Sequence, residues 1–176
     1  MKETLTASKR IYEGRVVTLD IVDVTLPDGN AAKREIVRHP GAVAVVPIDV
    51  DGNVILVSQY RTAADHVLIE IPAGTLHPGE DPAECARREL QEEIGYIPRS
   101  LTPMGSFFAA PGYTTELIHL FMATDLEHSP LPADHDEFIE VSRMPLRDAL
   151  EQAQSGMLHD GKSIIGILRV ARHLGL

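Results

Sequence analysis

Three glutamates, Glu89, Glu92 and Glu93, lie within one predicted helix and could together bind a divalent cation. Residues three and four positions apart share a helix face, so the three carboxylates crowd together. Like charges at this spacing destabilise a helix unless a cation lies between them. Carboxylate oxygens are hard ligands that select Mg²⁺, Mn²⁺ or Ca²⁺. A solvated acidic face beside Arg87 and Arg88 is the alternative, and the helix alone does not decide between the two.

Residues 81–94 are predicted to form the helix that carries these glutamates. Asp81 can cap its N-terminus, Pro82 suits the first helical position, and Gly95 can end it. We expect its apolar side to pack on a core, which would place the carboxylates at the edge of that core. The apolar residues on this side are Ala83, Ala86, Leu90 and Ile94.

The segment from Gly74 to Tyr96 reads GTLHPGEDPAECARRELQEEIGY. It resembles the Nudix box, G-x5-E-x7-R-E-U-x-E-E-x-G-U, in which U is a bulky apolar residue. With seven fixed residue types at about 7% usage each, a chance match at one starting point is on the order of 10⁻⁸. The matching residues are Gly74, Glu80, Arg88, Glu89, Leu90, Glu92, Glu93, Gly95 and Tyr96.

The resemblance implies a fold, a chemistry and a set of roles. The fold is α/β, an α/β/α sandwich around a mixed sheet, and the chemistry is hydrolysis of nucleoside diphosphates linked to another moiety. Arg88 and Glu92 are implied to be catalytic residues, and Arg88 is the group that would orient the carboxylates. The alternative is that Arg88 and Glu92 form a simple salt bridge on the surface of the helix. Mg²⁺ is the expected cofactor, with Mn²⁺ or Zn²⁺ as alternatives. Its implied ligands are the carbonyl of Ala73 and the side chains of Glu89, Glu92 and Glu93.

Motifs outside the box resemble the ADP-ribose pyrophosphatases among Nudix proteins, and this resemblance covers nearly the whole chain. Pro111, sixteen residues after Gly95, occupies the proline position that distinguishes this group. The implied reaction is Mg²⁺-dependent hydrolysis of ADP-ribose to AMP and ribose 5-phosphate. The alternatives are another sugar nucleotide, such as ADP-glucose or GDP-mannose, and a non-catalytic module that binds ADP-ribose. The motifs span residues 59–61, 70–74 and 110–116, with 12–15 and 33–35 nearer the N-terminus.

The same motifs suggest the substrate contacts. Arg61 is expected to bind phosphate, because a guanidinium matches phosphate oxygens in bidentate geometry; a rim salt bridge is the alternative. Tyr12 could stack on adenine with Arg15 or Arg34 nearby, or it could pack within a small sheet. The other expected contacts are Glu70, Pro111, Gly112 and Glu116, of which the two glutamates could instead be ordinary exposed carboxylates.

Hydrolysis needs an activated water, and the loop before Phe138 offers two candidate bases. Alignment on residues 138–141 places Glu137 at the glutamate that serves in some of the resembling enzymes. Others use the residue two positions earlier, which here is His135, and Glu116 is a third candidate. An acidic surface loop without a catalytic role is the alternative. We favour Glu137, because it lies next to the predicted strand whose register fixes its position.

The elements that must position these residues fall into two parts. Residues 1–39 are predicted to be a small antiparallel sheet, in which 15–26 and 31–38 pair across the turn at 27–30. This part resembles an element that is shared across a homodimer and completes the partner's adenine site. Residues 40–176 are predicted to be the hydrolase domain. Its expected strands are 41–50, 54–60, 68–71, 104–108, 117–124 and 138–142, and its later helices are 145–154 and 162–173.

Composition limits the function classes. The net charge of −10 repels polyanions, so nucleic-acid binding is not expected. An acidic protein that handles phosphates needs metal ions to reverse the local sign of charge. No apolar stretch is long enough to cross a bilayer, and residues 1–10 lack the apolar core of a secretory signal. The single cysteine, Cys85, fits a reducing compartment, and we expect a cytoplasmic protein whose partner is a small nucleotide sugar.

Overall fold

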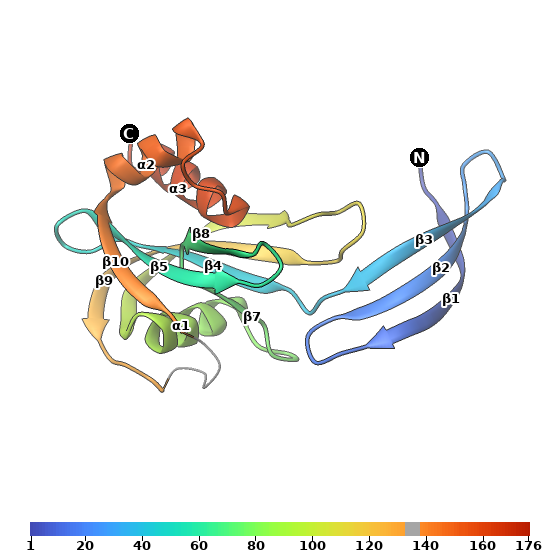
Figure 1. Ribbon diagram of the computed structural model, residues 1–176, viewed down its shortest axis with the longest axis horizontal. Helices are drawn as coiled ribbons and strands as arrows, with labels where there is room; N and C mark the ends of the chain where they lie inside the picture. The colour runs from blue at the N-terminus through green and yellow to red at the C-terminus, as the bar shows by residue number, and fades with distance from the viewer. Residues whose placement is uncertain (133–137) are drawn as a thin grey trace. The chain divides into compact units, whose positions relative to one another are not determined.

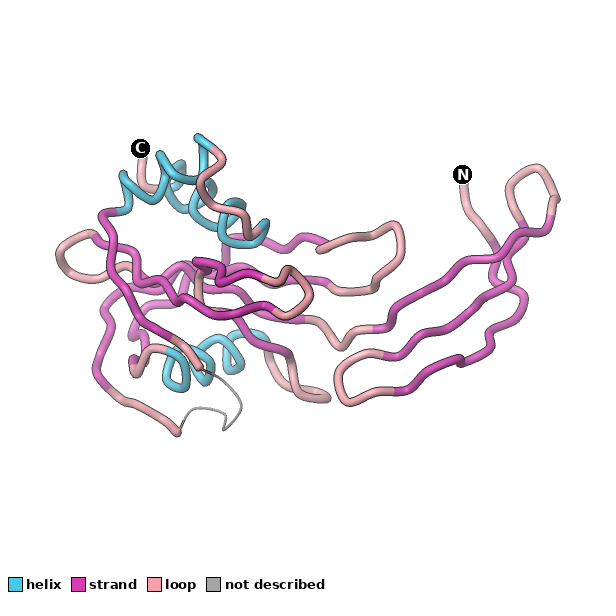
Figure 2. Tube along the Cα trace, viewed as in Figure 1, coloured by secondary structure: helices cyan, strands magenta, loops and turns pink. Residues whose placement is uncertain are grey.

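The computed structural model describes residues 1–132 and 138–176, which form ten strands and three helices. The chain divides into two compact units, Met1–Gly41 with Phe108–Leu117, and Ala42–Phe107 with Ile118–Leu176. Figure 2 shows strands and loops in the first unit and all three helices in the second. None of these helices is long and apolar enough to cross a membrane. The division at residue 39 into a shared element and a hydrolase domain stays a prediction.

A three-stranded antiparallel sheet makes up most of the first unit. Its central Asp20 is buried and accepts hydrogen bonds from Arg10 and Arg38 on the two flanking strands, each 3.1 Å long. One carboxylate therefore ties all three strands together. Gly29, with φ 88°, forms the turn between the second and third strands. The strands are β1 (Thr4–Glu13), β2 (Thr18–Thr25) and β3 (Ala31–Arg38), with β2 in the centre.

β1 is one of two strands that the sequence pattern does not predict. All ten of its residues are exposed, and it lies at the edge of its sheet. A strand without a buried face needs no alternation of apolar and polar residues, which removes the signal used to predict it. The expected pairing of residues 15–26 with 31–38 is present as β2 and β3, within a larger sheet than the sequence predicts.

Two sheets form the framework of the second unit. The larger has the order β7-β4-β9-β8 and the smaller the order β10-β5-β6. β4 pairs in parallel with β9 and antiparallel with β7, so the larger sheet is mixed. The strands are β4 (Ala42–Pro47), β5 (Asn53–Arg61), β6 (His66–Glu70), β7 (Ala73–Thr75), β8 (Tyr96–Phe108), β9 (Leu117–His128) and β10 (Glu140–Pro145), and the helices are α1 (Pro82–Glu93), α2 (Leu146–Ser155) and α3 (Gly161–His173).

Helices cover both faces of this framework, with α1 on one side and α2 and α3 on the other (Figure 1). The side chains of β4 alternate between two hydrophobic clusters. Ala44 and Val46 belong to a cluster with residues of α2 and α3, whereas Val43 and Val45 belong to a cluster with residues of α1. A strand buried on both faces reads as a continuous apolar run, as this one does. The expected α/β/α sandwich around a mixed sheet is confirmed.

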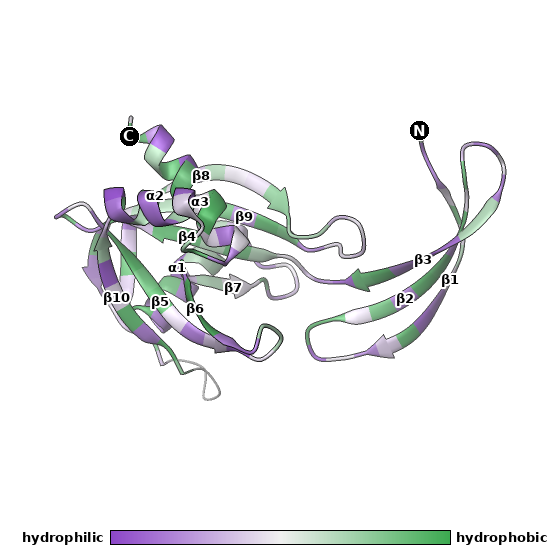
Figure 3. Cartoon of the chain, turned by 45° about the horizontal axis from the view of Figure 1, so that its top comes forward, coloured by the Kyte–Doolittle hydropathy of each residue, from purple (hydrophilic) through white to green (hydrophobic). Residues whose placement is uncertain are grey.

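The helices lie close to their predicted ranges, whereas some strands do not. Asp81 caps α1 by accepting the backbone N–H groups of Ala83 and Glu84 at 2.8 and 3.3 Å. Figure 3 shows hydrophobic and hydrophilic segments alternating along α2 and α3, as packing on a core requires. β8 begins at Tyr96, earlier than predicted, and the short β7 is not among the predicted strands. Pairing with β4, rather than any local pattern, creates β7.

Candidate functional site

The turn before α1 directs Glu80 toward the helix. The backbone N–H of Glu80 donates to the carbonyl of His77 at 3.0 Å, and the Glu80 side chain accepts the N–H of His77 at 2.9 Å. Gly79, within this turn, has φ 78°, a conformation that favours glycine. The turn therefore holds the Glu80 carboxylate where it can meet Arg88, which is more than one helical turn into α1.

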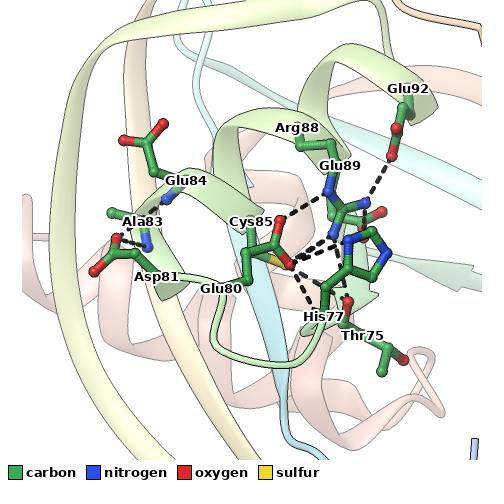
Figure 4. Close-up of polar contacts among 10 residues, drawn as sticks. All are labelled: Thr75, His77, Glu80, Asp81, Ala83, Glu84, Cys85, Arg88, Glu89 and Glu92. Carbon is green, nitrogen blue, oxygen red and sulfur yellow. Dashed lines mark hydrogen bonds and ion pairs between the residues drawn. The ribbon is translucent and has the colours of Figure 1, made fainter.

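Arg88 lies at the centre of the carboxylates (Figure 4). Its guanidinium donates to Glu80 at 2.9 and 3.1 Å, to Glu89 at 2.7 Å and to Glu92 at 2.9 Å. It also donates to the carbonyl of Thr75 in β7 at 3.4 Å. The pair of Arg88 with Glu92 is therefore one part of a larger network, in which one cation orients three carboxylates.

The charges in this network shift the ionisation of its members. Hydrogen bonding from Arg88 lowers the pKa of Glu80 to about 2, and its own hydrogen bonds to Glu80 raise the pKa of Arg88 above its ordinary value. Both groups are therefore charged at neutral pH. Burial raises the pKa of the Cys85 thiol to about 12, so this side chain stays a neutral thiol.

The other face of the carboxylate cluster meets β7. Glu89 and Glu93 are only 8% and 9% exposed. The backbone N–H of Ala73 donates to Glu93 at 3.1 Å. A Cβ atom on Gly74 would lie 1.8 Å from the carboxyl carbon of Glu89, so only glycine allows the strand to come this close. The first glycine of the box is therefore required for steric reasons. Ala73 contacts Glu93, and its neighbour Gly74 lies against Glu89, so β7 meets two of the predicted metal ligands.

The chemistry of these side chains suits a divalent cation. Glu80, Glu89, Glu92 and Glu93 formally carry four negative charges, and Arg88 provides one positive charge among them. Carboxylates in excess over nearby cations are the ligands that hard divalent ions prefer. Within residues 1–132 and 138–176, no three acidic, histidine or cysteine side chains converge as a metal cluster. Glu89 and Glu92 accept hydrogen bonds from Arg88, and Glu93 accepts one from the backbone of β7. The ligand roles stay a prediction that this donor set supports.

A second charged cluster surrounds Glu70 at the end of β6. Glu70 is 1% exposed, so it is not an ordinary surface carboxylate. Arg61 of β5 donates to its two oxygens from Nε and Nη2, at 2.8 and 2.7 Å, while the Arg61 side chain remains 41% exposed. Lys162 of α3 also donates to Glu70 and lies 3.0 Å from Asp160. The pKa of Arg61 is raised above its ordinary value, first by its hydrogen bonds to Glu70 and also by the charge of Glu93.

One short segment, residues 70–75, joins the two clusters. On one side the N–H of Ile71 donates to the hydroxyl of Ser163 in α3 at 2.8 Å. On the other side the N–H of Ala73 donates to Glu93 in α1. Helices on opposite faces of the sandwich therefore hold the same six residues in place. These contacts fix the position of the candidate phosphate-binding cluster around Glu70 relative to that of the candidate metal ligands on α1.

Three candidate substrate residues belong to the first unit. Tyr12 of β1 is 57% exposed, and its ring lies over Gly14, where a Cβ atom would come within 2.7 Å of it. Arg34 of β3 pairs with Glu3 at 2.5 Å, and Arg15 lies in the connection between β1 and β2. The ring of Tyr12 is accessible for stacking, and the roles of all three at adenine stay predictions.

A loop of the first unit carries further candidates. Val37 of β3 donates to the carbonyl of Tyr113 at 2.8 Å and accepts the N–H of Thr115 at 3.0 Å, which holds the loop to the sheet. The candidates on this loop are Pro111, Gly112 and Glu116. The candidate bases Glu137 and His135 lie outside the described residues.

Sequence reasoning missed Lys162 and Ser163. The run Asp160-Gly161-Lys162-Ser163 carries a helix-capping signal, and Asp160 does accept the N–H of Ser163 at 3.0 Å. Nothing in that signal points to Glu70, which is 92 positions away along the chain. Only the packing of α3 against the sheet brings the two together.

Comparison with known proteins shows the family to which this chain belongs. A family model of the NUDIX domain matches residues 38–163, which is more than half of the chain and includes the whole box. The chain belongs to the Nudix family. A relative from Bacillus subtilis (strain 168), named ADP-ribose pyrophosphatase, is 41% identical over 95% of this chain and 91% of its own length. A Bacillus methanolicus protein named methanol dehydrogenase activator is also 41% identical, over 94% of this chain and 91% of its own.

A solved structure supports the same assignment of the fold. A crystal structure described as an ADP compounds hydrolase superposes on this chain with a TM-score of 0.87 and 25% sequence identity. The match covers 99% of this chain and 97% of that one. The Nudix fold expected from the box is therefore confirmed for the described residues, including those outside the box.

The Glu70 cluster predicts how stability depends on pH. Burial acts to raise the pKa of Glu70, but the hydrogen bond from Arg61 and the charge of Lys162 outweigh it, so this pKa lies below the ordinary 4.5. Such a carboxylate stabilises the folded chain above pH 4.5 and loses this contribution as the pH falls through its folded pKa. Glu70→Gln should lower the free energy of unfolding at neutral pH by about 3 kcal/mol, because two cations lose their shared anion. It should also flatten the decline of that free energy in acid.

Urea unfolding followed by circular dichroism, from neutral pH into acid, measures both effects. The control is Glu127→Gln, which removes an exposed strand glutamate paired with Arg99 and should keep the wild-type pH dependence. A Glu70→Gln variant that declines in acid as steeply as the wild type would contradict the lowered pKa.

Proposed function

We propose that this chain hydrolyses the diphosphate bond of ADP-ribose to give AMP and ribose 5-phosphate, with a divalent cation as cofactor. The observation that carries the proposal is the intact box, in which Arg88 gathers three of the four glutamates at the edge of the sheet. The similarity to a protein named ADP-ribose pyrophosphatase supports the substrate, because it extends almost from end to end. Relatives named GDP-mannose pyrophosphatase are less similar, at 34% identity.

Mg²⁺ is the cofactor that we propose, with Mn²⁺ or Zn²⁺ as alternatives. A bound divalent cation would neutralise diphosphate oxygens and lower the pKa of a coordinated water. Arg88 contributes by fixing the carboxylates in place, so that little reorganisation is needed when a ligand arrives. The residues that would hold the cation are Glu89, Glu92, Glu93 and the carbonyl of Ala73.

Arg61 is proposed to bind the diphosphate. It is partly exposed, and of its five N–H groups it donates two to Glu70, with none of the described residues accepting from Nη1. Glu70 is buried and accepts hydrogen bonds from Arg61 and Lys162, so we assign it to holding Arg61 rather than to contacting ribose directly. The proposed contacts to adenine and ribose are Tyr12, Arg15, Arg34, Pro111, Gly112 and Glu116.

Glu137 is proposed as the general base, with His135 and Glu116 as alternatives. The proposal rests on the alignment with residues 138–141, because Glu137 and His135 lie outside the described part of the chain. A homodimer in which residues 1–39 serve the partner's adenine site, and a cytoplasmic location, are part of the same proposal. A non-catalytic module is disfavoured, because such a module has no need to retain every glutamate of the box.

A panel of nucleoside diphosphate derivatives tests the substrate. The protein is incubated with Mg²⁺ and ADP-ribose, ADP-glucose or GDP-mannose, and chromatography identifies the products. We expect kcat/KM for ADP-ribose to exceed that for the other two by about tenfold or more, with AMP and ribose 5-phosphate formed in equal amounts. A preference for GDP-mannose would reassign the substrate. Binding of ADP-ribose without any product would support the non-catalytic module instead.

Glu93→Gln tests the metal assignment. An amide is a poorer ligand than a carboxylate for a hard cation, so activity at limiting Mg²⁺ should fall by about 100-fold while the fold is kept. Glu84→Gln, an exposed glutamate on the same helix that pairs with Arg87, is the matched control and should keep wild-type activity. If Glu93→Gln hydrolyses ADP-ribose as fast as the wild type when Mg²⁺ is limiting, Glu93 does not bind the metal.

A further inference from the structure

Lys162 is a largely buried cation outside the Nudix box. It lies in the first turn of α3, and its side chain is 15% exposed. Its ammonium group donates to Glu70 and lies 3.0 Å from Asp160. Lysine is rarely buried unless it is paired, because removing its charge from water is costly. The reason for its position must therefore lie in the groups with which it pairs.

Lys162 and Arg61 share one carboxylate. Arg61 contacts both oxygens of Glu70, and Lys162 donates to Oε2, the same oxygen that accepts from Nη2 of Arg61. Two cations that bind one carboxylate compete for the same lone pairs. Each cation therefore weakens the attraction between the carboxylate and the other cation. Sharing therefore loosens Arg61 from Glu70 without removing the contact that orients it.

The cluster is neutral because of Lys162. Arg61 and Lys162 offset the charges of Glu70 and Asp160. Without the lysine, two carboxylates would face Arg61 alone, and the cluster would carry a net charge of −1. Two carboxylates that only Arg61 offsets would hold its guanidinium more firmly and leave it less available to an incoming diphosphate.

The backbone near Glu70 is fixed by other contacts. The hydroxyl of Ser163 accepts the N–H of Ile71 at 2.8 Å and donates to Asp160 at 2.5 Å. None of these contacts uses the side chain of Lys162, so they remain when that side chain is replaced. The electrostatic role of Lys162 can therefore be separated from the docking of α3.

We propose that Lys162 is a positioning residue for diphosphate binding: by sharing Glu70, it sets the orientation and the charge balance that let Arg61 bind phosphate oxygens. This inference rests on the proposed function, because it takes a diphosphate to be the ligand of Arg61. Lys162 acts through Glu70 and Arg61 and touches no reacting atom. Its effect should therefore fall on substrate affinity and should disappear when Arg61 is absent.

A double-mutant cycle tests this coupling. Lys162→Met keeps the length of the side chain and removes its charge, and Arg61→Ala removes the residue through which it acts. Kinetics with ADP-ribose and Mg²⁺ are measured for the wild type, both single variants and the double variant. Lys162→Met should raise KM about tenfold with little change in kcat, because substrate and transition state lose the same interaction. In the Arg61→Ala background it should change KM by less than about twofold.

Two further variants separate positioning from stability. Lys162→Arg keeps the positive charge and should restore most of the affinity. Arg169→Met removes another cation of α3, which donates to the carbonyl of Met104 at 3.0 Å and lies over the ring of Phe107, and it should leave KM unchanged. Thermal unfolding of every variant shows which of them are folded. If Lys162→Met does not fold, Lys162→Gln replaces it in the same cycle.

The outcomes distinguish the inference from the function on which it rests. If the effects of Lys162→Met and Arg61→Ala on KM multiply in the double variant, Lys162 does not act through Arg61 and the proposal is overturned. A wild-type KM in Lys162→Met overturns it equally. A wild-type protein that hydrolyses no nucleoside diphosphate derivative overturns the proposed function, and the inference falls with it.

Discussion

Four carboxylates crowd the edge of α1 and the turn before it, and one guanidinium holds three of them there. Arg88 donates to Glu80 in the turn, to Glu89 and Glu92 on the helix, and to the carbonyl of Thr75 in β7. Because one side chain spans turn, helix and strand, it sets where each of these carboxylates can lie. The negative charge that Arg88 does not offset is what makes a divalent cation the natural ligand of this edge.

The rest of the proposed site follows from how residues 70–75 are held. The N–H of Ile71 is fixed by Ser163 from α3, and the N–H of Ala73 is fixed by Glu93 from α1. A segment held from both faces of the sandwich fixes the distance between the cluster around Glu70 and the carboxylates around Arg88. Binding a metal ion and a phosphate together requires such a fixed arrangement, because the entropy of bringing the groups together is lost on folding rather than on binding.

Much of this could be predicted from the sequence because it depends on local patterns. The cap at Asp81 and the apolar stripe predict α1, and the continuous apolar run predicts β4 as a strand buried on both faces. β1 and β7 lack such patterns: one buries no residue, and the other exists only through its pairing with β4. The contact of Lys162 with Glu70 joins residues 92 positions apart, and no local signal encodes it. Long-range electrostatic pairing was therefore the part of the site that required the structure.

A titration of Mn²⁺ into the protein without substrate tests most directly whether the carboxylates around Arg88 bind a divalent cation. Electron paramagnetic resonance would follow the free Mn²⁺ for the wild type, for Glu89→Gln, and for Glu84→Gln as the exposed control on the same helix. The account predicts saturable binding to the wild type and the control, and binding about tenfold weaker or more to Glu89→Gln. Equal affinity in all three proteins, or no saturable binding to the wild type, would contradict it.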